Sequence, residues 1–198
     1  MLIQSLIELT NSHMKAQELF LLLNNIKPLI RHGYYEHELP QIEQFCHQHS
    51  LLLVKSPFKV LLDDNNNQFT NRGLRLPVTD PRSGLFFIYI SKDEKTAHLA
   101  LLSELQNNHH QLGHLLGYPT CCINFFTTNF SDQHTNPQHP PTNPWTNLTK
   151  RQQDICLLSH FPCQSNCKES IALAKLYFEV LNAEEPEYAQ KVLKVLTI

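Results

Sequence analysis

Two short cysteine motifs constrain this chain more than any other feature. Residues 116–122 read Leu-Gly-Tyr-Pro-Thr-Cys-Cys, and residues 160–167 read His-Phe-Pro-Cys-Gln-Ser-Asn-Cys. In each motif an aromatic residue and a proline come shortly before cysteine, and an apolar segment with helical periodicity follows. Four of the six cysteines lie in these motifs. The motifs are therefore predicted to converge on one thiolate-rich site.

The positions of these cysteines relative to the expected helices suggest what the site does. Pro119 favours the first turn of a short helix, which places Cys121 and Cys122 in that turn. A second helix is expected to begin near Cys167, with Cys163 in the turn before it. Helix N-termini carry unpaired N–H groups and partial positive charge, so a thiol there ionises more easily and the thiolate can bind metal. These four cysteines are the predicted metal ligands.

Three chemistries fit such a site. An iron–sulfur cluster could be held by Cys163 and Cys167 with one or both of Cys121 and Cys122, and a three-cysteine site would leave one iron open for substrate. A zinc ion could take three cysteines and His160. A metal-free thiol redox protein is the third possibility, although no Cys-x-x-Cys is present. We favour an iron–sulfur enzyme with His160 as a catalytic acid or base, and keep a zinc-stabilised, non-catalytic binding module and the thiol protein as alternatives.

Composition sets the class of protein. With 198 residues, the chain is expected to form a single domain. A net charge of −2 gives no electrostatic reason to expect a nucleic-acid partner, and no apolar run is long enough to span a membrane. Because no secretory signal is evident, we expect a cytoplasmic protein with reduced cysteines. Its partner is expected to be a small molecule or another protein.

The first half of the chain predicts an α+β fold. Residues 1–49 are expected to form helices, two within 1–27 and a third over 40–49. Residues 50–92 are expected to form a small antiparallel sheet, centred on 51–90, with a strand pair divided at Pro57, a turn over 63–68, an edge strand over 74–78 and a strand over 85–90. The basic side chains of this region are interpreted as a solvated sheet face rather than an anion-binding rim: Lys55, Lys59, Arg72, Arg75 and Arg82.

Residues 93–198 are expected to be helical around the cysteine motifs. One long helix over 93–116 would bury its leucines, expose His110 and His114, hold His98 and His109 nearer the core, and end at Gly117. A Pro- and Asn-rich loop over 127–147, anchored by Trp145, could act as a lid. Helical spacing resumes over 148–160, and a capping box of Asn166 with Glu169 would start the next helix. A final helix runs to Leu196, and Cys46 and Cys156 are assigned to the core.

The paired motifs resemble an uncharacterised family of archaea and some bacteria, classed as a domain of unknown function. Its pattern is Leu-Gly-Tyr-Pro-x-Cys-Cys followed by His-Phe-Pro-Cys-x3-Cys, which corresponds here to residues 116–122 and 160–167. The strand over 85–90 and the helix that carries Glu104 also look similar, so the resemblance covers roughly residues 55–180. The family implies no established activity, substrate or cofactor.

Overall fold

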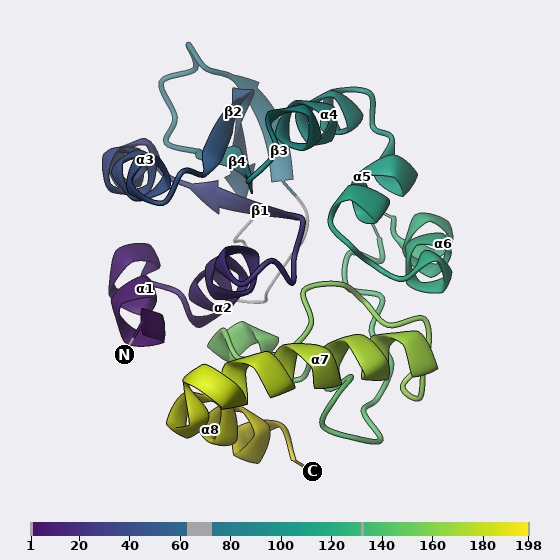
Figure 1. Cartoon of the computed structure of the whole chain (residues 1–198). Coiled ribbons are helices and arrows are strands. Elements are labelled where there is room, and N and C mark those ends of the chain that lie inside the picture. The colour runs from purple at the N-terminus through teal and green to yellow at the C-terminus, as the bar shows by residue number, and fades with distance from the viewer. Residues whose placement is uncertain (1, 63–72, 132, 198) are drawn as a thin grey trace. The chain divides into compact units, whose positions relative to one another are not determined.

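The structure is a computed structural model that describes residues 2–62, 73–131 and 133–197 (Figure 1). It confirms the α+β class, with a four-stranded antiparallel sheet and a helical C-terminal half. The chain divides into two compact units. We call residues 27–117 the sheet unit, and residues 1–26 together with 118–198 the cysteine unit.

The sheet unit is built on strands in the order β1-β4-β2-β3. Their bounds are β1 Leu29–Tyr34, β2 Leu52–Leu62, β3 Gly73–Pro77 and β4 Leu85–Ser91. Helix α3 (Leu39–Gln48), entered through the 3-10 turn η1 (Glu36–Glu38), and helix α4 (Glu94–Leu105) flank the sheet (Figure 1). The short helix α5 (His109–Leu115) follows α4. The expected turn over 63–68 lies outside the described residues.

Two expectations for the strands were wrong. Residues 1–49 contain a strand as well as helices, because β1 follows Pro28 and pairs along β4 from Leu29 to Tyr34. Pro57 does not divide two strands. Strand β2 runs through it, and the pairing with β4 shifts register between Lys55 and Lys59. A bulge of this kind lets a proline, which has no N–H to donate, lie inside a strand.

The single helix expected over 93–116 is two helices. Asn107 has φ of 53°, which stops α4, and the Asn108 side chain accepts a hydrogen bond from Gln111 N to begin α5. The expected end at Gly117 is confirmed by its φ of 76°. The expectation that α4 buries its leucines was wrong, because Leu102 is 47% exposed. The residues that α4 buries are Ala97, Ala100, Ser103 and Glu104. His110 and His114 are exposed as expected, but His98 and His109 are exposed too.

Glu104 explains why α4 turns this face to the sheet. Its carboxylate accepts hydrogen bonds from Arg31 Nε on β1 at 2.5 Å and from Arg75 Nη2 on β3 at 2.8 Å. The two guanidinium groups lie over aromatic rings of the sheet, that of Arg31 at 3.8 Å from the centroid of Phe87 and that of Arg75 at 4.7 Å from that of Phe58. The ion pairs thus join both edge strands to α4. Arg75 is therefore paired rather than simply solvated, and Arg72 lies outside the described residues.

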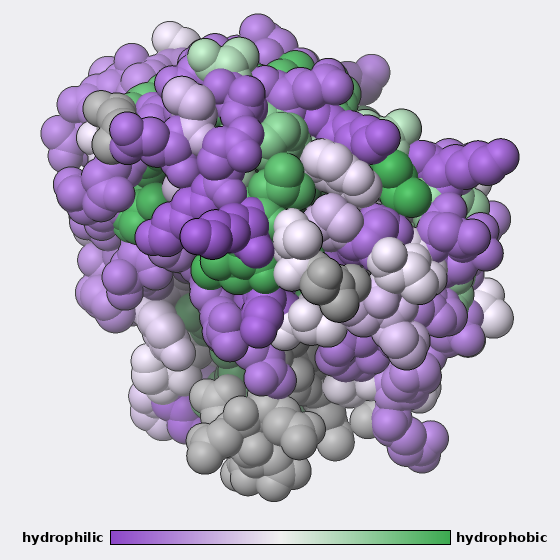
Figure 2. All heavy atoms as spheres, turned by 90° about the horizontal axis from the view of Figure 1, so that it is seen from below, coloured by the Kyte–Doolittle hydropathy of each residue, from purple (hydrophilic) through white to green (hydrophobic). Residues whose placement is uncertain are grey.

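The named elements of the cysteine unit are all helices. They are α1 (Leu2–Thr10), α2 (His13–Leu23), α6 (Thr120–Asn129), the 3-10 turn η2 (Arg151–Gln153), α7 (Lys168–Glu184) and α8 (Pro186–Leu196), with a long, mostly irregular segment between α6 and α7. Helix α7 buries Ala174, Tyr177 and Leu181. Among the helices that the structure describes, none combines the length and the apolar composition that a membrane-spanning helix needs. The face drawn in Figure 2 is mostly hydrophilic, with its apolar side chains in small groups.

The prediction of a helix over 148–160 was wrong, because only the short turn η2 forms there. Asp154 follows η2 in the left-handed conformation, with φ of 60°. Its carboxylate accepts hydrogen bonds from Ser12 Oγ and from the backbone N–H groups of His13 and Met14 at the start of α2. Residue 154 is therefore a long-range helix cap, which a continuous helix could not provide.

Replacing Asp154 by alanine is expected to lower the free energy of unfolding by about 1–2 kcal/mol, because the N–H groups that begin α2 lose their acceptor. Chemical denaturation of Asp154→Ala and of the wild type measures this difference. Glu179→Ala removes an exposed carboxylate from α7 and is the matched control, with little change expected. Equal stability of Asp154→Ala and Glu179→Ala would show that the cap contributes nothing.

Candidate metal centre

The start of α6 positions the first cysteine pair. Pro119 is the N-cap of α6 with extended backbone, so Cys121 and Cys122 occupy the first turn as expected. The N–H of Cys122 donates to Pro119 O at 2.9 Å. Cys122 is buried, whereas Cys121 is partly exposed.

The start of α7 positions the second pair. Cys167 itself is the N-cap of α7, and it is fully buried. The capping box expected from Asn166 and Glu169 was wrong, because α7 starts one residue later than that box requires. Cys163 lies in the loop before α7 and is partly exposed. In Figure 1 the N-terminal end of α7 lies toward α6, so the two pairs meet.

The loop before η2 holds the second motif in place. Asn143 Nδ2 donates to Ser165 O at 2.7 Å, and Thr146 Oγ1 donates to the same carbonyl at 2.5 Å. Trp145 lies edge-on to Phe178 of α7, with ring centroids 5.6 Å apart. This loop, expected over 127–147, begins only after α6 ends at Asn129. Its hydrogen bonds support the backbone between Cys163 and Cys167, a role that the sequence did not indicate for Asn143 or Thr146.

The four cysteine sulfurs form one compact group. Cys121 Sγ and Cys122 Sγ are 3.8 Å apart, and each lies 3.7 Å from Cys167 Sγ. Cys163 completes the group, in which all four sulfurs lie within 4.8 Å of one another. The predicted ligand residues are thus brought together by segments about forty residues apart in sequence, and the group could hold a metal ion.

Hydrogen bonds reach the sulfurs from the surrounding chain. The backbone N–H of Cys163 donates to Cys122 Sγ at 3.3 Å, and Ser170 Oγ lies 3.1 Å from the same sulfur. Glu169 Oε2 lies 3.4 Å from Cys167 Sγ and 3.8 Å from Cys121 Sγ, on the exposed side. Sequence reasoning missed Ser170, although its place three residues after Cys167 puts it on the same face of α7.

The protein environment alone does not favour four thiolates. Burial raises the pKa of Cys121 and of Cys122, and it raises that of Cys163 to about 12. Burial also opposes ionisation of Cys167, but hydrogen bonds from the hydroxyl and backbone N–H of Ser170, together with those from Cys163 and Cys121, outweigh it and lower that pKa. A bound cation would supply the missing stabilisation, because metal ligation deprotonates thiols.

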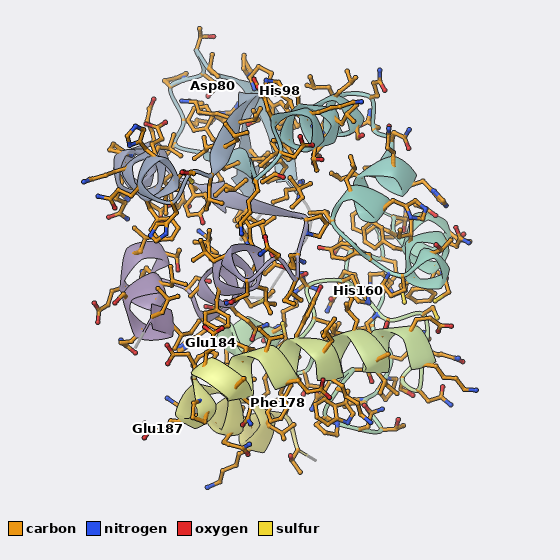
Figure 3. The ribbon with its side chains drawn as sticks, in the orientation of Figure 1. Asp80, His98, His160, Phe178, Glu184 and Glu187 are labelled. Carbon is orange, nitrogen blue, oxygen red and sulfur yellow. The ribbon has the colours of Figure 1, made fainter. Side chains whose placement is uncertain are left out.

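His160 is not part of the sulfur group and instead contacts Ser170, which borders it. Its Nε2 is 2.9 Å from Ser170 Oγ, and its ring packs on Tyr118 with centroids 5.0 Å apart. The side chain is buried. Figure 3 shows His160 beside the N-terminal half of α7, whereas Glu184 lies at the C-terminal end of this helix. His160 therefore reaches Cys122 through the Ser170 hydroxyl.

The fold and the site define an α+β protein with a four-cysteine cluster that could hold a metal. The sequence identifies it further: the chain belongs to the family described as "Protein of unknown function (DUF483)", which matches residues 96–196. This match includes both cysteine motifs and confirms the resemblance to a family of unknown function. Searches of curated proteins and of solved structures found no match.

Proposed function

We propose that the four cysteines hold a single zinc ion that stabilises the cysteine unit and takes no part in catalysis. The spacing of the sulfurs supports this proposal most strongly. A regular tetrahedron with zinc–sulfur bonds of about 2.3 Å has sulfur–sulfur edges of about 3.8 Å. The three sulfurs of Cys121, Cys122 and Cys167 are 3.7–3.8 Å apart, which is one face of such a tetrahedron. Cys163, whose sulfur lies within 4.8 Å of the other three, would supply the fourth vertex.

An iron–sulfur enzyme, which the motifs alone favour, agrees less well with this spacing. In a cubane cluster each thiolate binds a different iron, which holds the thiolates farther apart than four thiolates sharing one ion. Four sulfurs within 4.8 Å of one another therefore fit one metal ion better than a cluster. The metal-free thiol alternative agrees less well too, because a reactive cysteine must be both ionised and accessible. The pKa of three of the four is raised, and Cys167, whose pKa is lowered, is fully buried.

The number of protein ligands supports a structural role. Catalytic zinc keeps one coordination position for water or substrate, whereas structural zinc is closed by four protein ligands. Four cysteines fill all four positions and leave no need for His160 as a ligand. We assign His160 to positioning: its Nε2–H donates to Ser170 Oγ, so that the Ser170 O–H donates to the Cys122 thiolate. Its action as a catalytic acid or base stays a prediction.

Metal analysis of the protein purified under reducing conditions tests the proposal. We expect one zinc per chain in a colourless protein, and much less in the double variant Cys122→Ser, Cys167→Ser. The control Cys156→Ala removes a buried cysteine of the same unit that contacts Met14 instead of the cluster, so it should keep its zinc. Stoichiometric iron with sulfide and visible colour would show that the site holds an iron–sulfur cluster instead of zinc. Equal zinc in all three proteins would show that zinc binds outside the four cysteines.

Ser170→Ala is expected to weaken zinc binding about 10- to 100-fold, because groups that orient metal ligands contribute this much to affinity. Competition with a chromophoric zinc chelator measures the change. Ser165→Ala is the control: Ser165 lies in the loop just before α7, and its backbone carbonyl rather than its hydroxyl makes the contacts. If Ser170→Ala and Ser165→Ala bind zinc as tightly as the wild type, Ser170 does not support the ligand.

A further inference from the structure

The sheet unit contains a cavity of its own. Its volume is about 440 Å³, within the range of small-molecule sites. Its residues come from three places: strands β2 and β4 contribute Lys59 and Phe86, the segment that leads from β1 into η1 contributes Tyr35, Glu36 and His37, and the turn before β4 contributes Pro81, Arg82, Ser83 and Gly84. Asp80, which opens this turn, is labelled in Figure 3.

Lys59 is the unusual residue of this cavity. Only 9% of the residue is exposed, and its ammonium group donates to two backbone carbonyls, Asp80 O at 2.5 Å and Arg82 O at 3.0 Å. An ammonium group has three N–H donors, so one remains. Within the described residues, no carboxylate forms an ion pair with it. Buried charges in proteins are normally paired, which makes Lys59 a ready partner for an anion.

The neighbouring carboxylate is already neutralised by another group. Asp80 forms hydrogen bonds with Arg82 through Nε at 2.9 Å and Nη2 at 2.8 Å, and these bonds hold the pKa of Asp80 well below its ordinary value. The charge of Lys59 also contributes to this lowering, but the ion pair of Asp80 is made with Arg82. The Asp80–Arg82 pair has no net charge, so the positive charge of Lys59 is left for a ligand. Glu36 and His37 are on the exposed rim.

The rim also offers flat surfaces. The rings of Tyr35 and His37 are stacked, with centroids 5.8 Å apart and planes at 11°. Tyr35 is 38% exposed, whereas Phe86 forms a buried apolar part of the cavity wall. A ligand with a planar apolar group could therefore lie against the rim while its charged end reaches Lys59.

We propose that this cavity binds a small organic anion, with a carboxylate or phosphate group on Lys59 and a planar apolar group against Tyr35 and His37. The site is independent of the cysteine cluster and of any metal held there. This role differs from the solvated sheet face expected from the sequence for Lys59 and Arg82, and it gives the protein a small-molecule partner.

Calorimetric titration of the full chain with benzoate, phenyl phosphate and the neutral benzyl alcohol tests the proposal. We expect at least one of the two anions to bind and benzyl alcohol not to bind; the anion that binds more tightly tells a carboxylate site from a phosphate site. Lys59→Met is expected to weaken binding about tenfold or more, because a charged hydrogen bond is lost. Lys95→Met, which removes an exposed lysine of α4 outside the cavity, should bind as the wild type does.

A second variant covers the case in which Lys59→Met does not fold. Ser83 is exposed on the turn that borders the cavity, so Ser83→Trp fills the cavity without disturbing buried residues. It should abolish anion binding while leaving the thermal unfolding temperature unchanged. The proposal is overturned if the wild type binds neither anion up to about 10 mM, if benzyl alcohol binds as well as the anions, or if folded Ser83→Trp binds them as the wild type does.

Discussion

On the proposed zinc site, treating the wild-type protein with a chelator is expected to unfold most of the cysteine unit. Structural zinc contributes about 10–16 kcal/mol to the folding of small zinc domains, which is comparable to the total stability of a typical domain. The cluster joins the start of α6, the start of α7 and the loop that carries Cys163. Circular dichroism should therefore report a large loss of helix, which added zinc restores and added magnesium does not.

The double variant Cys122→Ser, Cys167→Ser provides the matched control, because it cannot form the site and its signal should not respond to chelator. Hydrogen exchange reports on the two units individually. After chelation, protection of the backbone N–H groups should be lost in α6 and α7, whereas strands β1 and β4 of the sheet unit should keep theirs. A protein that is metal-free by mass analysis and melts at the wild-type temperature would contradict the structural role.

The variant Glu104→Gln is expected to lower the free energy of unfolding of the sheet unit by about 3 kcal/mol. Glu104 is only 5% exposed and pairs with two arginines, so its neutralisation leaves Arg31 and Arg75 without a counter-charge. Chemical denaturation measures the loss. Glu94→Gln, at the exposed start of the same helix, is the control and should change stability by less than about 1 kcal/mol.

The same carboxylate predicts how stability depends on pH. Burial opposes ionisation of Glu104, but the charges and hydrogen bonds of Arg31 and Arg75 outweigh it, so the pKa in the folded protein is below its ordinary value. Its contribution is therefore complete above the unfolded-state pKa of about 4.3 and is lost as the pH falls through the lower, folded-state value. Glu104→Gln should remove this part of the acid dependence. An unchanged pH profile would mean that Glu104 does not carry it.

The sequence predicted the cysteine site better than the elements around it. Pro119 is a local helix-start signal, so the first turn of α6 followed from the sequence alone. The meeting of Cys122 with Cys167 was inferred only from the likeness of the two motifs. The spacing from Cys167 places Ser170 on the cysteine side of α7, but its contact with Cys122 Sγ depends on the tertiary meeting of the two motifs.

Tertiary contacts account for the elements that sequence reasoning missed. The leucines of α4 formed the most obvious apolar stripe, yet the helix turns Glu104 to the sheet because two arginines from distant strands meet it there. Residues 148–160 have helical spacing, but the backbone at Asp154 is left-handed and its carboxylate caps α2. In both cases hydrogen bonds to partners far away in sequence outweigh local periodicity.

X-ray absorption at the zinc edge of the purified protein tests the central claim most directly, because it measures both the ligands and their number. One zinc per chain should have four sulfur neighbours at about 2.3 Å and no nitrogen. A nitrogen neighbour in place of one sulfur would bring His160 into the coordination sphere. An absorption edge from iron, with a second iron nearby, would contradict the single-ion site and support an iron–sulfur cluster instead.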